Sequence, residues 1–278
     1  MKTELYTIDT LSNLHVGAGD INFDIIDNQV QRDPITTLPN INSSSLKGAF
    51  REHFSTFDQD GKKLDDSKMV KYIFGADSKD NKNQQAGAYS FFEAQLLTRP
   101  VRSSEKPYFN ATSPAVLTAL LQTLEDFEIS FDESLKAEIK KLSELRVSKP
   151  LIFENLQNVM LEDFEAEYKS FDTSKLKEFL GDDLALFSDK DFKELTLPVL
   201  ARNHLEDGVS KNLWYEEVVP KKSKFFFCIS KPTNLDERDK KEKIDGFENR
   251  FNREGSRIQF GANKSRGYGF SKVTKVSK

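Results

Sequence analysis

The stretch of sequence that decides the fold is LPNINSSSLKGAFR, which occupies residues 38–51. A turn at residues 38–40 precedes three serines and then a helical pattern, which predicts a helix over residues 44–57. Serine or asparagine at a helix start can cap free backbone N–H groups, and the same groups bind an anion well. Lys47 and Arg51 lie one turn apart on one face and add positive charge. The stretch predicts either an ordinary capped helix with two solvated cations or a helix that binds phosphate.

The composition of the 278-residue chain indicates one large globular domain or two small ones. Hydrophobic residues make up 37% of the chain and charged residues 31%, which is typical of a soluble protein. No apolar run approaches the roughly 18 residues that cross a bilayer, and the amino terminus lacks the apolar centre of a signal peptide. The single cysteine, Cys228, lies in an apolar run and is expected to be buried. We therefore expect a cytoplasmic protein with no membrane contact.

Charge is distributed unevenly along the chain. The net charge is -4, yet residues 121–195 carry 19 acidic and 10 basic side chains, whereas residues 241–278 carry 10 basic and 4 acidic ones. Local potential governs the binding of a polyanion more than whole-chain charge does. The pattern predicts a basic scaffold that carries an acidic insertion at residues 121–195, and it is compatible with a nucleic-acid partner.

Apolar periodicity predicts an α+β fold. Strands are expected at residues 3–11, 88–100, 257–260 and 269–276, and helices at residues 44–57, 113–125 and 244–253. Residues 196–229 are typical of a strand, a long polar hairpin and a return strand that contains three consecutive phenylalanines. A long loop or β-hairpin is expected at residues 20–37.

The motifs for several common chemistries are absent from the sequence. It contains no Walker loop, no zinc-type histidine pair and no cysteine pair. With only three histidines, a zinc site or a Ser-His-Asp triad is poorly supported. His15 lies beside two glycines and is the best of the three for contact with a ligand.

The loop at residues 20–33 contains four aspartates, at positions 20, 24, 27 and 33. Loop carboxylates can hold Mg²⁺ or another divalent metal through oxygen ligands and water. A metal there can activate a nucleophile or stabilise a leaving oxygen in phosphodiester cleavage. The alternative interpretation is a solvated acidic loop.

Two other segments combine basic and aromatic residues. Residues 261–270 read GANKSRGYGF, in which glycines let backbone N–H groups approach phosphate while Lys264 and Arg266 add charge. The polar hairpin contains Arg202 and Trp214 and can wedge bases of a nucleic acid apart. The alternatives are an ordinary glycine turn for the first segment and an edge hairpin covered by a neighbouring subunit for the second.

Three separated segments together resemble the RAMP superfamily of CRISPR-associated proteins. They are LHVGAG with DNQVQRDPITTLPNINSSSLKGAFR, then GAYSFFEAQLLTRPVRS, and finally RIQFGANKSRGYG. Within that superfamily the chain is similar to the repeated backbone subunit of type III-B (Cmr) effector complexes. The resemblance implies a single RAMP domain over residues 1–278, with a modified RNA-recognition (ferredoxin-like) fold, insertions and a long β-hairpin thumb at residues 200–228.

The resemblance also implies the partners and the reaction. Copies of the chain and other type III-B subunits would stack along a CRISPR guide RNA, and each copy would cut target RNA in a metal-dependent endoribonuclease reaction. The family's catalytic aspartate corresponds to Asp27, which would also be the metal ligand, while Asp24 remains a neighbouring candidate. His15 is a possible helper in catalysis. The expected RNA-binding residues are Ser43, Ser44, Lys47, Arg51, Arg202, Trp214, Lys264 and Arg266.

One departure and two alternatives accompany this prediction. Asn42 stands where the family has glycine, so the backbone contact with RNA at that position is in doubt. The chain can instead be a catalytically inactive structural subunit that binds guide RNA. It can also be a guide-processing endoribonuclease, in which a histidine would carry catalysis.

Overall fold

The computed structural model describes residues 1–19, 26–55, 68–75, 86–234, 247, 251 and 256–276. The described helices are α1 (Ser43–Phe54), α2 (Lys68–Phe74), α3 (Pro114–Asp126), α4 (Glu133–Ser143), α5 (Lys177–Leu180) and α6 (Asp189–Glu194), with a 3-10 turn at Lys264–Arg266. None of these helices is long and apolar enough to cross a bilayer.

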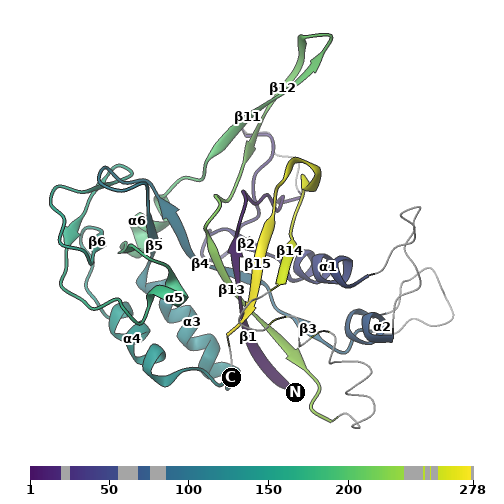
Figure 1. Cartoon of the computed structure of the whole chain (residues 1–278), viewed down its shortest axis with the longest axis horizontal. Helices are drawn as coiled ribbons and strands as arrows, with labels where there is room; N and C mark the ends of the chain where they lie inside the picture. The colour runs from purple at the N-terminus through teal and green to yellow at the C-terminus, as the bar shows by residue number, and fades with distance from the viewer. Residues whose placement is uncertain are drawn as a thin grey trace.

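The described strands form one large mixed sheet and two small hairpins (Figure 1). The main path of the large sheet runs β14 (Ser256–Gln259), β15 (Phe270–Lys275), β1 (Lys2–Thr10), β13 (Lys224–Lys231), β4 (Ala94–Val101), β5 (Phe109–Thr112), β10 (Leu184–Leu186), β6 (Leu151–Ile152) and β9 (Glu167–Tyr168). Off this path, β2 (Asn40–Ile41) pairs with β4 and β3 (Ser90–Phe91) pairs with β13. The hairpins are β7 (Met160–Leu161) with β8 (Phe164–Glu165), and β11 (Val199–Glu206) with β12 (Val209–Glu217).

An aromatic core joins α1 to one face of the central strands. Tyr6 of β1 stacks on Phe227 of β13 at 5.3 Å between ring centroids, and Phe50 of α1 lies 5.8 Å from Phe227. All three side chains are almost fully buried. Burying each large apolar side chain contributes roughly 1.5–3 kcal/mol, so this contact fixes α1 on the sheet.

The helix predicted at residues 113–125 is confirmed as α3. Ser113 is its N-cap residue, Pro114 occupies the first turn, and the helix ends at Asp126. Proline suits this position because the N–H that it lacks has no partner within the helix. Val116, Leu117, Leu120 and Leu124 are buried, as their helical spacing predicts.

The predicted acidic insertion contributes strands to the large sheet. β10 pairs with β5 in parallel and with β6 in antiparallel register, and β6 pairs with β9 in parallel. Residue 121 lies inside α3, so the structure shows no break at the start of the predicted insertion. The helix predicted at residues 244–253 lies outside the described residues apart from Phe247 and Phe251, both of which are buried in the aromatic core.

The long polar hairpin is present and projects from the body of the molecule (Figure 1). β11 and β12 are joined by Asp207 and Gly208, which both have positive φ. The return strand β13 lies inside the large sheet and is flanked by β1 and β4. The projecting part is therefore residues 199–217, and the end of the segment predicted at residues 200–228 belongs to the core.

Candidate functional site

The Asp27 side chain lies against the base of the β11–β12 hairpin. Asp27 is exposed, and its Oδ2 accepts a hydrogen bond of 2.8 Å from the backbone N–H of Tyr215. Asn28 continues the attachment, because its N–H donates to the Tyr215 carbonyl at 3.1 Å and its carbonyl accepts from Glu217 N–H at 2.9 Å. The carboxylate is thus held by the backbone of β12.

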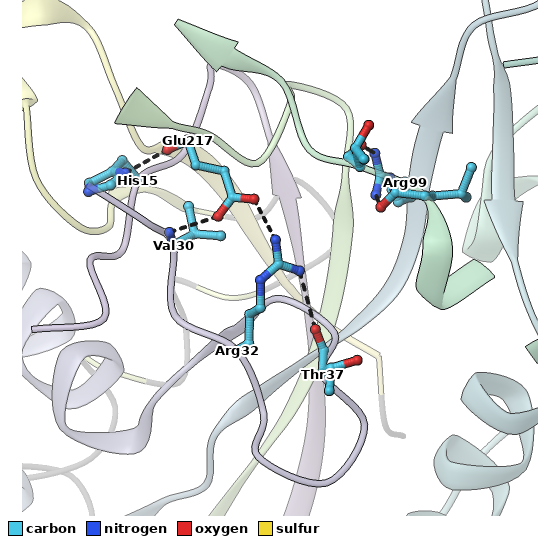
Figure 2. Close-up of polar contacts among 8 residues, drawn as sticks. His15, Val30, Arg32, Thr37, Arg99 and Glu217 are labelled. Carbon is cyan, nitrogen blue, oxygen red and sulfur yellow. Dashed lines mark hydrogen bonds and ion pairs between the residues drawn. The ribbon is translucent and has the colours of Figure 1, made fainter. Parts of the chain in front are cut away.

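Glu217 holds the same loop through its side chain (Figure 2). Its Oε2 accepts from Val30 N–H at 3.1 Å, and its Oε1 lies 2.5 Å from Nη2 of Arg32, whose Nη1 donates to the Thr37 carbonyl at 3.2 Å. The Glu217 side chain is 7% exposed and that of Arg32 is 36% exposed. A buried carboxylate needs such donors, so these bonds fix the position of the loop that contains Asp27.

His15 reaches Glu217 from the amino-terminal segment (Figure 2). Its ring is buried, and Nδ1 lies 2.7 Å from the Glu217 carbonyl oxygen. Because a carbonyl only accepts, Nδ1 carries the proton, and a neutral His15 has its lone pair on Nε2. Nε2 faces Gly17, where a Cβ atom would come within 3.4 Å of it. His15 and Asp27 therefore both contact the same short stretch of β12, at Glu217 and Tyr215.

Arg99 holds the segment that leads into β11 (Figure 2). Its guanidinium donates to the carbonyls of Leu195 at 2.9 Å and Thr196 at 2.6 Å. Arg99 is buried, and desolvation lowers its pKa to about 10, so it stays charged at neutral pH. Both strands of the hairpin are therefore anchored at the base.

The glycine-rich loop, residues 261–269, packs against the amino-terminal segment. Ala262 N–H donates to the His15 carbonyl at 2.9 Å, and Gly269 N–H donates to the Asn13 carbonyl at 2.8 Å. Gly261 has a φ of +73°, and a Cβ atom there would lie 2.2 Å from the His15 carbonyl oxygen. Only glycine fits such a position. Part of the glycine content that predicted a phosphate cradle is therefore explained by packing inside the protein.

Glu216 joins the hairpin to the glycine-rich loop. Its buried carboxylate accepts from Nε of Arg202 at 2.9 Å and from the side-chain amide of Asn263. The Arg202 guanidinium also lies over the Tyr268 ring, 5.0 Å from its centroid, and donates to the Tyr268 hydroxyl. Arg202, predicted to bind RNA, is thus held by protein groups, and its contact with RNA stays a prediction.

Trp214 and Arg266, both predicted to bind RNA, lie together. The Arg266 guanidinium is 6.0 Å from the Trp214 ring centroid, at cation–π distance. Arg266 and Lys264 are exposed on the 3-10 turn of the glycine-rich loop, and Trp214 is half-buried on β12. A cation and an aromatic ring from distant parts of the sequence therefore share one surface.

The start of α1 offers backbone donors without a competing group. Asn42 is the N-cap residue, but its side chain makes no capping hydrogen bond, contrary to the expectation of a capped helix start. Ser43 and Ser44 are exposed, and the first turn contains no acidic residue. Lys47 and Arg51 are half-buried further along. Such a helix start suits an anion.

α1 also lies beside the glycine-rich loop. The Phe50 ring is 5.9 Å from the ring of Phe260, which directly precedes that loop, and Figure 1 shows α1 next to β14. α1 and the glycine-rich loop are therefore neighbours, and the same loop contacts the hairpin base through Asn263 and Glu216.

Among the described residues, no group of three or more histidine, cysteine or acidic side chains is close enough to hold a metal. Asp27 is exposed, and its Oδ1 makes no hydrogen bond within the described part of the chain. Mg²⁺ is commonly bound through one or two carboxylates, substrate phosphates and water, so Asp27 fits a metal of that kind. Asp20 and Asp24 lie outside the described residues.

Sequence reasoning missed the residues that hold the site together, which are Arg32, Arg99, Glu216, Glu217 and Asn263. One signal was available for two of them. Glu216 and Glu217 stand between Tyr215 and the apolar pair Val218 and Val219, next to strands expected to be buried. Charged residues in such a position need buried partners. The identity of those partners depends on the tertiary fold.

Comparisons with known proteins support the resemblance along the whole chain. The chain is 28% identical over 300 aligned residues to the CRISPR system Cmr endoribonuclease Cmr4 of Pyrococcus furiosus, and the alignment covers 99% of this chain and 96% of that relative. A crystal structure of oligomeric Cmr4 from the same organism matches with a TM-score of 0.71 and 25% identity, over 100% of this chain and 99% of the other.

A chain of a type III-B Cmr-beta complex in the apo state matches with a TM-score of 0.75 and 21% identity, over 99% of this chain and 97% of that one. The similarity extends along almost the entire length of both chains and confirms the α+β fold class, while the RNA-recognition detail of the fold stays a prediction. The family model of the RAMP superfamily matches residues 7–272. The chain therefore belongs to the RAMP superfamily.

Proposed function

We propose that this chain is a backbone subunit of an RNA-guided type III-B complex, and that each copy cuts target RNA at Asp27. The observation that carries the proposal is the attachment of the Asp27 carboxylate to the backbone N–H of Tyr215, at the base of a projecting hairpin. The Cmr4 relative is named an endoribonuclease, which supports cleavage as the reaction. Further copies of the chain, other complex subunits, guide RNA and target RNA are the proposed partners.

The guide RNA would lie along the start of α1 and the glycine-rich loop. Ser43, Ser44 and the free backbone donors of the first turn would bind phosphate, with Lys47 and Arg51 adding charge. Lys264 and Arg266 would extend this basic surface to Trp214, on which a base can stack. Phosphate contacts of this kind hold RNA without reading its sequence, so base pairing with the guide would provide specificity.

The residues at the hairpin base are suited to cutting RNA at a distorted nucleotide. RNA carries its own nucleophile, the 2′-OH, which attacks the adjacent phosphorus while the bond to the 5′-oxygen breaks. This attack requires the 2′-oxygen, the phosphorus and the leaving oxygen to be in line, and the projecting hairpin would separate the bases and turn the backbone into that geometry. Asp27 would accept the proton of the 2′-OH, with His15 as the proposed helper in proton transfer.

A divalent metal is compatible with this arrangement. Asp27 would be its protein ligand, and RNA phosphates and water would complete the coordination. When bound, Mg²⁺ or another divalent ion would neutralise charge that develops on the phosphate and the leaving oxygen.

The matched pair Asp27→Asn and Asp27→Ala tests the proposal. Asparagine keeps an oxygen acceptor for the Tyr215 N–H but loses the negative charge, whereas alanine loses both. Target cleavage should fall about 100-fold to 10,000-fold in both variants, as expected when a general base is removed. Guide binding, measured by filter retention, should not change. Asp126→Asn, on the exposed end of α3, serves as the control.

Cleavage at the wild-type rate by complexes that contain Asp27→Asn would remove Asp27 from catalysis and favour a structural subunit. If substitution of His15 abolishes cleavage while the Asp27 variants cleave at the wild-type rate, the guide-processing reaction would be favoured instead.

A further inference from the structure

A pocket of about 400 Å³ opens beside the base of the β11–β12 hairpin, between the end of β4 and the turn that leads into β13. Its walls are largely apolar and include Pro100, Leu197, Pro198 and Pro220. Tyr108, which directly precedes β5, adds one half-buried aromatic ring. Pockets of roughly 300–1,000 Å³ with apolar walls and a few polar groups are typical of sites that bind small organic groups.

The charged side chains that line the pocket already have partners in the protein. Arg102 pairs with Glu162 at 2.6 Å, and the buried Arg99 donates to the carbonyls of Leu195 and Thr196. These contacts occupy the polar groups of the lining. The pocket therefore suits a flat group that carries no net charge.

Two lysines adjoin the pocket and lack an acidic partner. Lys221 and Lys222 directly follow Pro220 and are exposed, and within the described part of the chain neither pairs with a carboxylate. The Lys222 ammonium donates to the Tyr108 hydroxyl at 2.9 Å and lies 5.0 Å from the centroid of its ring. Lys222 thus fixes the ring, and the two charges would attract a phosphate beside an apolar pocket.

The backbone at Lys222 is unusual for a lysine. The Ser223 N–H donates to the Pro220 carbonyl at 3.3 Å, which closes a turn with Lys222 at its third position, and φ there is +74°. A positive φ at this position favours glycine, so a lysine strains the turn. Strain of this kind is concentrated at sites where the side chain has a role. Here the side chain reaches Tyr108, at the wall of the pocket.

The pocket adjoins the segment that holds the Asp27 loop. Pro220 lies three residues after Glu217, whose side chain anchors that loop, and the Val218 N–H donates to the Pro198 carbonyl at 3.0 Å. Under the proposed function the nucleotide that is cut lies at Asp27. Its base, once separated from the duplex, would reach the pocket along the same hairpin base.

We propose that this pocket binds the base of one unpaired target nucleotide at each cut, with Tyr108 stacked on the base and Lys221 and Lys222 on the adjoining phosphates. The inference rests on the proposed function and adds the place where the displaced nucleotide is held. Holding the base outside the duplex would keep the 2′-oxygen and the phosphorus in line for attack. Stacking uses the face of a base, so the pocket would accept all four bases.

Photo-cross-linking of assembled complexes tests where the base lies. A single 4-thiouridine is moved through the positions around one cut in the target, or through the facing positions of the guide. The cut nucleotide carries deoxyribose, so the target lacks the attacking 2′-OH and stays intact. Mass spectrometry should map cross-links from one target position to Tyr108 or to the turn at residues 220–222. Cross-links from the guide alone would overturn the assignment to the target strand.

The pair Tyr108→Ala and Tyr108→Phe tests the ring. Alanine removes the stacking surface, so target affinity should fall roughly 5-fold to 150-fold and the cross-link should disappear. Phenylalanine keeps the ring and should bind the target as the wild type does. Tyr168→Ala, which removes an exposed tyrosine from β9, serves as the control.

Lys222→Gly separates contact with RNA from support of the turn. Glycine suits the positive φ, so the melting temperature of the variant should equal or exceed that of the wild type. Target affinity and cross-linking should nevertheless fall, because a phosphate contact and the bond to Tyr108 are lost. A lower melting temperature with unchanged affinity would overturn the role of Lys222 in binding RNA.

The pocket and the proposed function can fail separately. Complexes that cut an all-ribose target but give no cross-link at the pocket from any target position would overturn the pocket and leave the proposed function standing. Wild-type complexes that bind the target without cutting it would overturn the proposed function instead.

Discussion

Two adjacent glutamates on β12 have different tasks, although both are buried at the base of the hairpin. Glu216 accepts from Arg202 and Asn263 and so joins the hairpin to the glycine-rich loop. Glu217 accepts from Val30 and Arg32 and so joins the hairpin to the loop that contains Asp27. Successive side chains of a strand point to opposite faces, and this alternation lets neighbouring carboxylates hold loops from opposite ends of the chain.

One hairpin would thus link the residues proposed to hold guide RNA with the residue proposed to cut the target. The Glu216 side faces the residues proposed to bind guide RNA, and the Glu217 side faces the residue proposed to cut the target. Substitutions on the two sides should therefore separate the two activities.

Among substitutions of the two glutamates and their neighbours, the largest effect is expected from Glu217→Ala. It removes the acceptor of Val30 N–H and the partner of Arg32, so the Asp27 loop loses its side-chain anchor. A displacement of about 1 Å at a reacting group can cost about 100-fold in rate, and we expect a loss of target cleavage of that size. Gel assays of assembled complexes give the rate. Equal losses of guide affinity and cleavage would show that the two sides do not act separately.

The next largest effect is expected from Lys47→Ala combined with Arg266→Ala, on the RNA-holding side. Removing two phosphate contacts should weaken guide binding and reduce the slope of log affinity against log salt. The slope should fall by about 0.7 for each single-strand phosphate contact, so by about 1.4 in total. Filter binding at several salt concentrations measures it. An unchanged slope would exclude both residues from the RNA surface.

A smaller effect is expected from Glu216→Gln. Glutamine keeps an acceptor for Asn263 but replaces the ion pair with Arg202 by a neutral hydrogen bond. The substitution should weaken this contact by roughly 1 kcal/mol, which corresponds to a loss of less than about tenfold in guide affinity. Fluorescence anisotropy with labelled guide RNA measures it. Cleavage per bound target should remain at the wild-type level. A drop in that rate would show that the two glutamates do not have separate roles.

Glu4→Gln should have no effect on RNA and serves as a buried control. Burial raises the pKa of Glu4, but hydrogen bonds and charge from Lys275 and Lys231 outweigh it and lower the pKa to about 2. Because the pKa of Glu4 is lower in the folded state, its ionised form stabilises the fold at pH values above the unfolded-state pKa near 4.5. This stabilisation is lost as pH falls toward 2. The variant should therefore lose at most about 3 kcal/mol of unfolding free energy at pH 7 and almost none near pH 2.

Thermal or urea unfolding across this pH range provides the test for Glu4. An equal loss of stability at pH 7 and at pH 2 would contradict the titration of Glu4, and a change in guide binding would show that a buried glutamate far from the hairpin also affects RNA.

Local patterns predicted the elements that pack on the core. The stripe of apolar residues behind Pro114 gave α3 to within one residue at each end, and Phe225–Phe227 gave the central strand β13. Periodicity succeeds there because each residue faces one environment. The strands β9 and β10, of two and three residues, carry no such period, so their addition to the large sheet depended on tertiary contacts.

The candidate site was predicted in its residue types but not in its connections. Asp27 and His15 were expected to act together, and the structure attaches both to β12. Arg202 was expected to bind RNA, yet it pairs with Glu216 on the facing strand of the hairpin and with Tyr268. Tyr268 lies 66 residues from Arg202, and a partner at that separation leaves no local signal in the sequence.

Mixed assembly tests the central claim, that each copy cuts one site through its own Asp27. Wild-type and Asp27→Asn chains are combined in several ratios on one guide, and the cuts in an end-labelled target are mapped at early times. We predict that every cut keeps its position and that its intensity falls in proportion to the wild-type fraction. Cuts that shift position, or that all disappear once a few variant chains are present, would contradict the claim.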